Sequence, residues 1–465
     1  MNKSFGKYAL LYLPWLASLV VQNNPAASYL IAWLGTFFLF YLCYSGKIKK
    51  LPDDRRIGEQ IMRPVYLVQI IFIGYMASTS IFYFIQLLGY GDQSFMIRSP
   101  AELEQKILLA AQCQRYYVLG HAAFLTGLLY TMKYPVKPEY TYDKSKLTAV
   151  LFQIAVICLP LSVISYRIPG LSQFYFQLTS LSFIAGTLAL AFAIPERRRV
   201  SILICCGMYL INFYQALTSG YKEPIIVSLL VLGIFLYPNY KKIVIAIFVP
   251  LFFLLAIYLP KYNQIFRQSA WGNDVTSEEA YESALDATLA TDAEYSNWGF
   301  LVYRLSEIDM FTQFVKSTPE YIDYYKFDLV GQALEVTVPR LFWPQKPITE
   351  TMVMERVYNA DVVNRGSTVS AKPAFIVDAY LSGGALGVFI GLFIYGAGIQ
   401  LISQKAEHLF GGYILGVALI FSGLFQIVWR GLSFEFMSNS VLWSYLTMLI
   451  IHKAMVKTFF LRRIY

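Results

Sequence analysis

A series of apolar stretches, each about 15 to 27 residues long, limits what this chain can fold into. Only 14% of its residues are charged, against about 25% in soluble domains, which excludes a disordered chain, a coiled coil and an ordinary soluble enzyme. Backbone groups cannot be hydrated inside lipid, so such stretches cross a membrane as helices. We therefore expect an all-α polytopic integral membrane protein with about 12 transmembrane helices. The expected spans are 8–21, 26–45, 65–88, 116–132, 147–165, 172–194, 200–217, 225–238, 243–259, 374–400, 411–429 and 440–456.

Lysine and arginine gather in alternate loops, and this pattern predicts the orientation of the helices. They are frequent in 46–64, in 133–146 and in the C-terminal tail, whereas the intervening loops are short and poor in cations. With about twelve spans, the basic loops and both termini fall on one side, which the positive-inside rule makes cytoplasmic. A signal peptide at 8–21 is the less favoured alternative, because the next span follows almost at once and suits a helical hairpin better.

A long segment at 260–372 divides the chain into three parts. Residues 1–259 are expected to form an N-terminal membrane bundle of about nine spans, and 373–465 a C-terminal bundle of about three. The segment between spans 9 and 10 then faces outward, and a loop of this length needs a functional reason. It holds ten Lys and Arg against sixteen Asp and Glu, so the net charge of +9 comes from the basic loops. This balance gives no support for a nucleic-acid partner.

The long segment carries two stretches of chemical interest. Apolar residues within 298–311 predict an amphipathic helix that holds Arg304 and Glu307, which can simply pair with each other at a spacing of three. The stretch 338–347, VPRLFWPQKP, contains three prolines that forbid a regular helix.

This proline-rich turn presents Arg340 and Lys346 beside Trp343 on a stiff backbone. Such a cationic turn suits phosphate oxygens, because the planar guanidinium group offers a fork of donors. The alternative is a membrane-anchoring turn whose cations extend to the interface.

The next expected span begins with further candidates. Arg365 precedes small and hydroxylated residues, whose backbone N–H groups suit an anion near a helix start. Asp378, two residues before Tyr380, lies near the outer end of a span, where a carboxylate is costly unless it is paired or used. The alternative role for Asp378 is an Asp–Lys or Asp–Arg pair within the bundle.

Cations therefore crowd the expected outer face. They include Arg167, Lys222 beside Glu223, Arg304, Arg340, Lys346, Arg365 and Arg430. Cations between aromatic segments suit a lipid-linked pyrophosphate and its sugars. No nucleotide-binding glycine motif and no metal-ligand spacing occurs, so we expect neither a cofactor nor a metal.

Three stretches resemble the Wzy-type oligosaccharide repeat-unit polymerases, the O-antigen polymerase family. They are the turn 218–224, the turn 338–347, and 367–387 with its Pro373 and paired glycines. The family shares the many spans and the single long periplasmic loop. One departure is Lys222, which stands where the family often has Arg and would bind pyrophosphate as a point charge.

The resemblance implies a metal-independent, GT-C-like membrane glycosyltransferase of the bacterial cytoplasmic membrane, with its long loop periplasmic. Its donor and acceptor would be polyprenyl-pyrophosphate-linked (undecaprenyl-type) oligosaccharides, polymerised into an envelope polysaccharide. Membrane lipids, a chain-length regulator and a flippase are the implied partners, and nucleic acid is not. The implied catalytic residues are Arg304, Arg340, Lys346, Arg365 and Asp378; those implied to bind substrate are Lys222, Glu223, Glu307, Trp343, Tyr380 and Arg430.

The general base and the exact activity stay open at this point. Asp378, Glu307 and Glu223 are the candidate bases, with His121 behind them. An O-antigen ligase would use the same architecture and donor with a different acceptor. A flippase is less favoured because the two halves show no repeat, and a scaffold would not need the outer cations.

Overall fold

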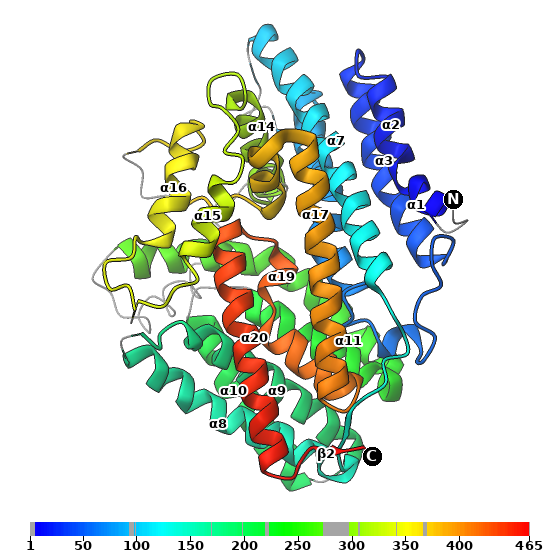
Figure 1. The fold of residues 1–465 in the computed structure, drawn as a ribbon, viewed down its shortest axis with the longest axis vertical. Helices are drawn as coiled ribbons and strands as arrows, with labels where there is room; N and C mark the ends of the chain where they lie inside the picture. Colours follow the sequence, from blue (N-terminus) through cyan, green and yellow to red (C-terminus); the bar gives the residue numbers. More distant parts are fainter. Residues whose placement is uncertain are drawn as a thin grey trace.

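The computed structural model describes residues 5–92, 97, 99–168, 170–197, 199–218, 223–272, 297–305, 307–340, 342–365 and 370–464. Within them the chain is mostly helical (Figure 1). Eight helices are long and apolar enough to cross a membrane: 25–44, 67–87, 144–167, 174–196, 199–218, 224–255, 375–409 and 434–457. These helices support an all-α membrane protein.

The predicted count of about twelve spans is not confirmed. The expected spans 225–238 and 243–259 both lie in the segment labelled α11 (Glu223–Gly272), which consists of two helices divided at Tyr240. A Cβ atom on Gly233 would lie 3.2 Å from Phe248, so the second helix packs back on the first. The expected span 8–21 is broken into α1 (Phe5–Ala9), η1 (Leu10–Tyr12) and α2 (Leu13–Val20).

The N-terminal half continues from a helical hairpin. α2 packs on α3 (Pro25–Tyr44), whose first turn is capped by Asn24 accepting from the Ala27 N–H at 3.1 Å. The elements that follow are η2 (Ile57–Glu59), α4 (Leu67–Gln69), η3 (Ile70–Gly74), α5 (Tyr75–Thr79), α6 (Ile81–Leu87), α7 (Pro100–Thr131), β1 (Tyr140–Thr141), η5 (Lys144–Lys146), α8 (Leu147–Arg167), α9 (Phe174–Glu196) and α10 (Arg199–Thr218).

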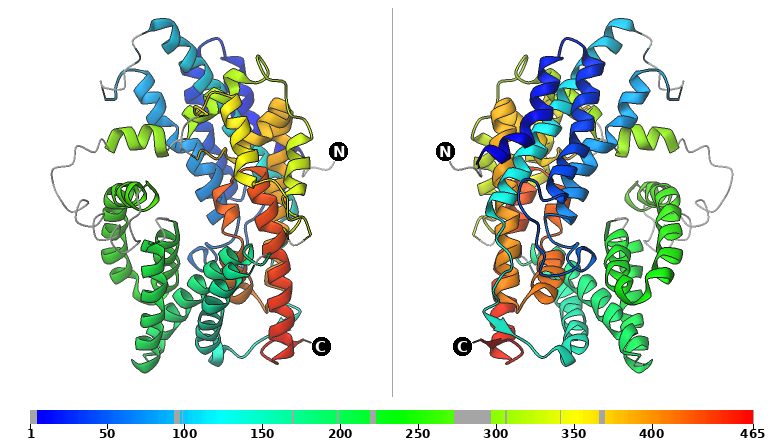
Figure 2. Two further views of the ribbon diagram at one scale, coloured as in Figure 1. Left: turned by 90° about the vertical axis from the view of Figure 1, so that its left-hand side faces the viewer. Right: turned by 90° about the vertical axis from the view of Figure 1, so that its right-hand side faces the viewer.

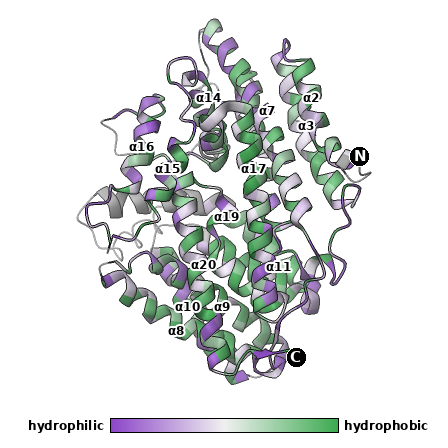
Figure 3. Ribbon diagram, in the orientation of Figure 1, coloured by the Kyte–Doolittle hydropathy of each residue, from purple (hydrophilic) through white to green (hydrophobic). Residues whose placement is uncertain are grey.

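The long segment and the C-terminal part complete the molecule. Their elements are α13 (Asn297–Phe300), η6 (Leu301–Leu305), α14 (Ile308–Ser317), α15 (Asp328–Glu335), α16 (Thr349–Asn359), α17 (Phe375–Leu409), η7 (Ile414–Phe421), α18 (Ser422–Leu424), α19 (Ile427–Arg430), α20 (Phe434–Lys457) and β2 (Arg462–Arg463). The amphipathic helix predicted over 298–311 is divided, because Glu307 adopts a left-handed conformation (φ 52°) and α14 starts afresh after it. Figure 3 shows hydrophilic residues on α16 and hydrophobic ones along α17.

α7 and α17 pack closely along their length (Figure 1). Glycines make this approach possible: a Cβ atom on Gly127 would lie 2.1 Å from the Phe393 carbonyl oxygen, and one on Gly396 would lie 2.1 Å from that of Phe124. Small residues let membrane helices approach until their backbones touch. The α7–α17 pair is therefore the structural centre of the bundle, and α3 packs on its side.

Three basic segments lie together at one end of this bundle. Lys49, from the loop 46–64, donates to the Leu129 and Met132 carbonyls at the end of α7. β1 in the loop 133–146 pairs with β2 in the C-terminal tail. The charge pattern predicted that these segments share one side, and their cytoplasmic placement stays a prediction.

The long segment folds over the opposite end of the bundle. α14 packs on α7 and α15 on α20. The Tyr380 hydroxyl donates to the Thr318 carbonyl at 2.6 Å, and the Tyr325 N–H to the Leu381 carbonyl at 2.9 Å. Figure 2 shows α10 and α11 on the side away from α20, and α9 contacts all three helices. This arrangement brings the long segment against the first turns of α17 and α20.

Candidate functional site

A cavity of about 640 Å³ lies where the long segment meets α9, α19 and α20. It brings together the predicted residues Arg340, Lys346 and Arg430, and adds Lys372. None of the described lining residues is acidic. The remaining lining residues are Tyr166, Gly170, Ser172, Gln173, Phe176, Gln177, Ser180, Pro224, Thr349, Leu424, Gln426, Ile427, Leu432, Phe436, Asn439 and Ser440.

The proline-rich turn 338–347 forms one wall and holds two of the cations by backbone contacts. The Lys346 ammonium group donates to the Val336 and Val338 carbonyls at 2.7 and 2.8 Å. Arg340 donates to the Pro347 carbonyl at 3.4 Å. Neutral carbonyls orient these cations without cancelling their charge, so both remain suited to an anion.

The pKa of Lys346 also indicates that the cavity suits an anion. Partial burial, and then the neighbouring Arg340 guanidinium group, lower its pKa below the ordinary value of a lysine. Both causes penalise the ammonium form. An anion between the two side chains would relieve the repulsion, which makes anion binding and protonation of Lys346 mutually favourable.

The opposite wall is built where α19 turns into α20. Arg430 ends α19, and Gly431 follows with φ 59°, a conformation that favours glycine. A Cβ atom on Gly431 would lie 1.8 Å from Phe72, so this position has no room for a larger residue. The segment that carries Lys372 lies beside this wall, since Ala374 bridges Leu432. The Lys372 ammonium nitrogen is 4.6 Å from the ring centroid of Phe436.

A buried cluster, which we call the clasp, consists of Arg356, Asp378 and Glu435. Arg356 donates from Nε and Nη2 to the two Asp378 oxygens at 3.0 and 2.9 Å. It donates from Nη1 and Nη2 to the two Glu435 oxygens at 2.7 Å each. Asp378 also accepts from the Phe434 N–H at 2.8 Å. Arg356 is 3% exposed and both carboxylates are fully buried, so the charges are satisfied chiefly by one another.

The clasp fixes three walls of the cavity at once, because it joins α16, α17 and α20. α16 begins at the lining residue Thr349, Lys372 lies just before α17, and Phe436 follows Glu435. Burial alone would lower the pKa of Arg356, yet the charges of Asp378 and Glu435 raise it overall. The guanidinium group is thus permanently charged and serves as the common anchor.

The contacts within the clasp argue against Asp378 as the general base. Its side chain has no exposed surface, and its oxygens accept from Arg356 and Phe434. The alternative of an Asp–Arg pair is confirmed, with the difference that the arginine comes from the long segment and not from the bundle. An accessible base must therefore be sought elsewhere.

Three other predicted residues lie outside the lining of the cavity. Arg365 pairs with Glu355 at 2.8 Å on the exposed side of α16, and this pairing lowers the pKa of Glu355. Tyr380 is buried and anchors Thr318. Trp343 is partly exposed on the proline-rich turn, between the two cations in sequence.

The remaining predicted residues are only partly described. Lys222 lies outside the described residues, and Glu223 begins α11 without a described side chain. Their neighbour Pro224 lines the cavity. The backbone of Arg304 lies in η6, and Glu307 is exposed at the break before α14.

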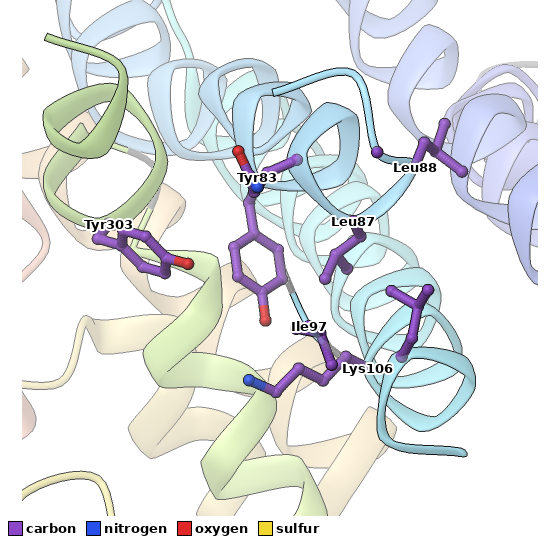
Figure 4. Close-up of a pocket in the computed structure, with 9 residues that line it drawn as sticks. Tyr83, Leu87, Leu88, Ile97, Lys106 and Tyr303 are labelled. Carbon is purple, nitrogen blue, oxygen red and sulfur yellow. The ribbon is translucent and has the colours of Figure 1, made fainter. Parts of the chain in front are cut away.

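A second, smaller cavity of about 240 Å³ lies between α6, α7 and η6. Figure 4 shows Tyr83, Tyr303 and Lys106 around it. The two tyrosine rings meet edge to face at 6.4 Å, and Lys106 pairs with Glu102 at 3.5 Å. Because the lysine in its described lining is already paired, this cavity is less suited to a polyanion than the larger one.

Sequence reasoning missed Lys372 and Arg356 as functional positions. Lys372 stands directly before Pro373 at the start of an expected span, where a cation at the membrane surface is a usable signal. Arg356 stands between Val353 and Val357 on α16, which marks a charge on the buried face of a helix. Among the described residues, no group of three or more His, Cys, Asp or Glu could hold a metal ion.

These features define a helical membrane protein with an anion-suited cavity where the long segment 260–372 meets the bundle. The chain belongs to the family described as Domain of unknown function (DUF8712), which it matches over residues 13–463. No curated protein and no solved structure matches it. The matched region includes both the cavity and the clasp.

Proposed function

We propose that this protein is a membrane glycosyltransferase that polymerises oligosaccharide repeat units carried on polyprenyl pyrophosphate. The observation that carries the proposal is the cavity with Arg340, Lys346, Lys372 and Arg430 and no acidic residue among its described lining. A diphosphate carries several negative charges, and four cations around one cavity attract it together. Lys346 and Lys372 are partly buried, whereas Arg340 and Arg430 are exposed.

The proposed reaction needs these cations on the leaving group. A hydroxyl of the acceptor glycan attacks the anomeric carbon of the donor and forms a new C–O bond. The bond from that carbon to the diphosphate oxygen breaks, and the lipid diphosphate leaves with the electron pair. Arg340 and Lys346 would stabilise the charge that develops on it.

The hydroxyl proton must pass to a base in the same step. Asp378 is enclosed in the clasp and is poorly placed for this task. Glu223 is the better candidate, because it stands next to the cavity-lining Pro224 in the sequence. The bacterial cytoplasmic membrane, the periplasmic side of the long segment, and the flippase and chain-length partners belong to the same proposal.

The proposal is tested with the purified full chain in detergent and a short lipid-pyrophosphate-linked repeat unit, without nucleotide sugar. We expect a ladder of longer lipid-linked glycans. Arg340→Ala and Lys346→Ala should each slow its formation about 10- to 100-fold, the cost of one charge-assisted hydrogen bond to the transition state. Lys316→Ala, an exposed cation of α14 outside the cavity, is the matched control and should keep the wild-type rate.

The outcome distinguishes polymerisation from ligase and flippase activity. A ladder that persists in both cavity variants would refute the role of the cations. No ladder from folded protein, together with transfer of the glycan to a different acceptor, would indicate a ligase. Movement of the lipid-linked glycan across liposomes without any transfer would indicate a flippase.

A further inference from the structure

One face of α9 forms a polar wall of the larger cavity. Gln173, Phe176, Gln177 and Ser180 all line it, and their spacing of three, four and seven residues places them on the same face. The rest of the helix is mostly apolar, and the hydroxyls of its other buried polar residues, Ser182 and Thr187, donate to the Ala155 and Phe183 carbonyls. Neutral hydrogen-bonding groups on this one face therefore need an explanation.

Gln177 is the most informative of these residues. Its side chain is 5% exposed, and its Oε1 atom has no hydrogen-bond partner among the described residues. One turn further on, the Ser180 hydroxyl donates to Gln426 Oε1 at 3.1 Å, so that pair is satisfied within the protein. A buried acceptor without a donor is unfavourable for folding, and such groups in native proteins often wait for a water molecule or a ligand.

The wall faces a complementary set of groups. Asn439 and Ser440 reach the cavity from α20, and the Phe176 ring adds an aromatic surface beside Gln177. The cations belong to other elements, namely the turn before α16, the residues before α17 and the end of α19. The cavity thus combines a cationic part with a neutral part made of hydroxyl, amide and aromatic groups.

We infer that the cavity binds a glycosyl phosphate, with the first sugar held against Gln177. The phosphate groups lie among the cations, a sugar hydroxyl donates to Gln177 Oε1, and Asn439 and Phe176 contact the same ring. This inference rests on the proposed function but adds to it: the protein distinguishes a glycosylated lipid phosphate from a bare one. Gln177 is then a specificity-determining residue for the sugar.

The test compares two ligands that differ only in the sugar. The purified full chain in detergent is titrated with farnesyl diphosphate and with farnesyl diphosphate that carries one glucose. We expect wild-type protein to prefer the glycosylated ligand. Gln177→Leu should reduce this preference about 2- to 10-fold, the contribution of one hydrogen bond, and leave the affinity for the bare diphosphate unchanged.

The test includes a control variant and a stability measurement. Gln153→Leu makes the same chemical change at an exposed position of α8 outside the cavity and should leave both affinities unchanged. The melting temperature of Gln177→Leu without ligand should equal or exceed that of wild type, because an unsatisfied buried acceptor is removed. A purely structural glutamine would instead be destabilised by this change.

The outcomes distinguish the inference from the function on which it rests. If Arg340→Ala weakens both ligands but Gln177→Leu weakens neither, the anion site stands and the sugar assignment is overturned. If Arg340→Ala weakens neither ligand, the proposed function of the cavity fails as well. Phosphatidylinositol in a third titration separates lipid sources: equal affinity would show that Gln177 recognises any hydroxylated headgroup, which overturns the glycosyl assignment.

Discussion

Replacing Arg356 by methionine should strongly destabilise this protein. The change removes four hydrogen bonds of 2.7–3.0 Å between the guanidinium group and the carboxylates of Asp378 and Glu435. Both carboxylates are fully buried and would then face each other without a cation. Breaking a buried ion pair from one side costs about 3–5 kcal/mol, and two anions share the loss here. We therefore expect a loss near the upper end of that range.

The assay is equilibrium unfolding of the purified protein in detergent, followed by tryptophan fluorescence and by protease resistance. The companion variant replaces Arg356, Asp378 and Glu435 together by Met, Asn and Gln. It should recover most of the lost stability, because a clasp without charges leaves no unpaired ion to bury. Arg365→Met is the matched control: its partner Glu355 is more than half exposed, and the pair should contribute at most about 1 kcal/mol.

Two results would show that the reasoning is mistaken. The first is a stability of Arg356→Met within about 1 kcal/mol of wild type, which would mean that water reaches the carboxylates and screens them. The second is a triple variant as unstable as the single one. The packing of the methylene groups of Arg356, and not its charge, would then hold the three helices together.

Two further outcomes follow from the walls of the cavity. Gly431→Ala should yield little folded protein, because its Cβ atom would meet Phe72 at 1.8 Å. The control Gly398→Ala has nothing within 4 Å of its Cβ atom and should fold normally. Size-exclusion chromatography compares the two variants. The affinity for inorganic pyrophosphate should fall as pH rises through the lowered pKa of Lys346, since its ammonium form binds the anion. Arg340→Gln removes the repelling charge and should move that fall to higher pH, measured by calorimetry across the pH range.

Much of the fold was predictable because membrane helices depend on local composition. Span-length apolar stretches predicted most of the long helices, and the alternating basic loops predicted which segments gather at one end of the bundle. The left-handed conformation of Glu307 was not predictable, because tertiary packing sets it on a locally helical sequence. The break at Tyr240 falls between the expected spans 225–238 and 243–259, where the sequence places Lys241 and Lys242. The span count stays unconfirmed: the expected spans 8–21, 116–132 and 411–429 are not among the eight span-length apolar helices, and 225–238 and 243–259 fall within a single one of them.

The candidate site was predictable only in part, for a related reason. Proline content and charge suffice to identify the turn with Arg340 and Lys346 as a stiff cationic element. No local pattern indicates that Arg356 pairs with Asp378 and Glu435, since the three come from separate helices. Isolated carboxylates at the ends of spans look the same in sequence whether they act on a substrate or hold helices together.

The pairing within the clasp explains how the cavity keeps its positive charge. Asp378 and Glu435 stand at the starts of α17 and α20, close in sequence to Lys372 and Phe436. Without Arg356, both carboxylates would carry uncompensated negative charge beside the wall that Lys372 and Phe436 form. Because the arginine satisfies both, the two carboxylates are enclosed and do not neutralise the positive charge of the cavity lining. Loss of Arg356 should therefore weaken anion binding even in molecules that remain folded, which links the stability of the clasp directly to the proposed chemistry.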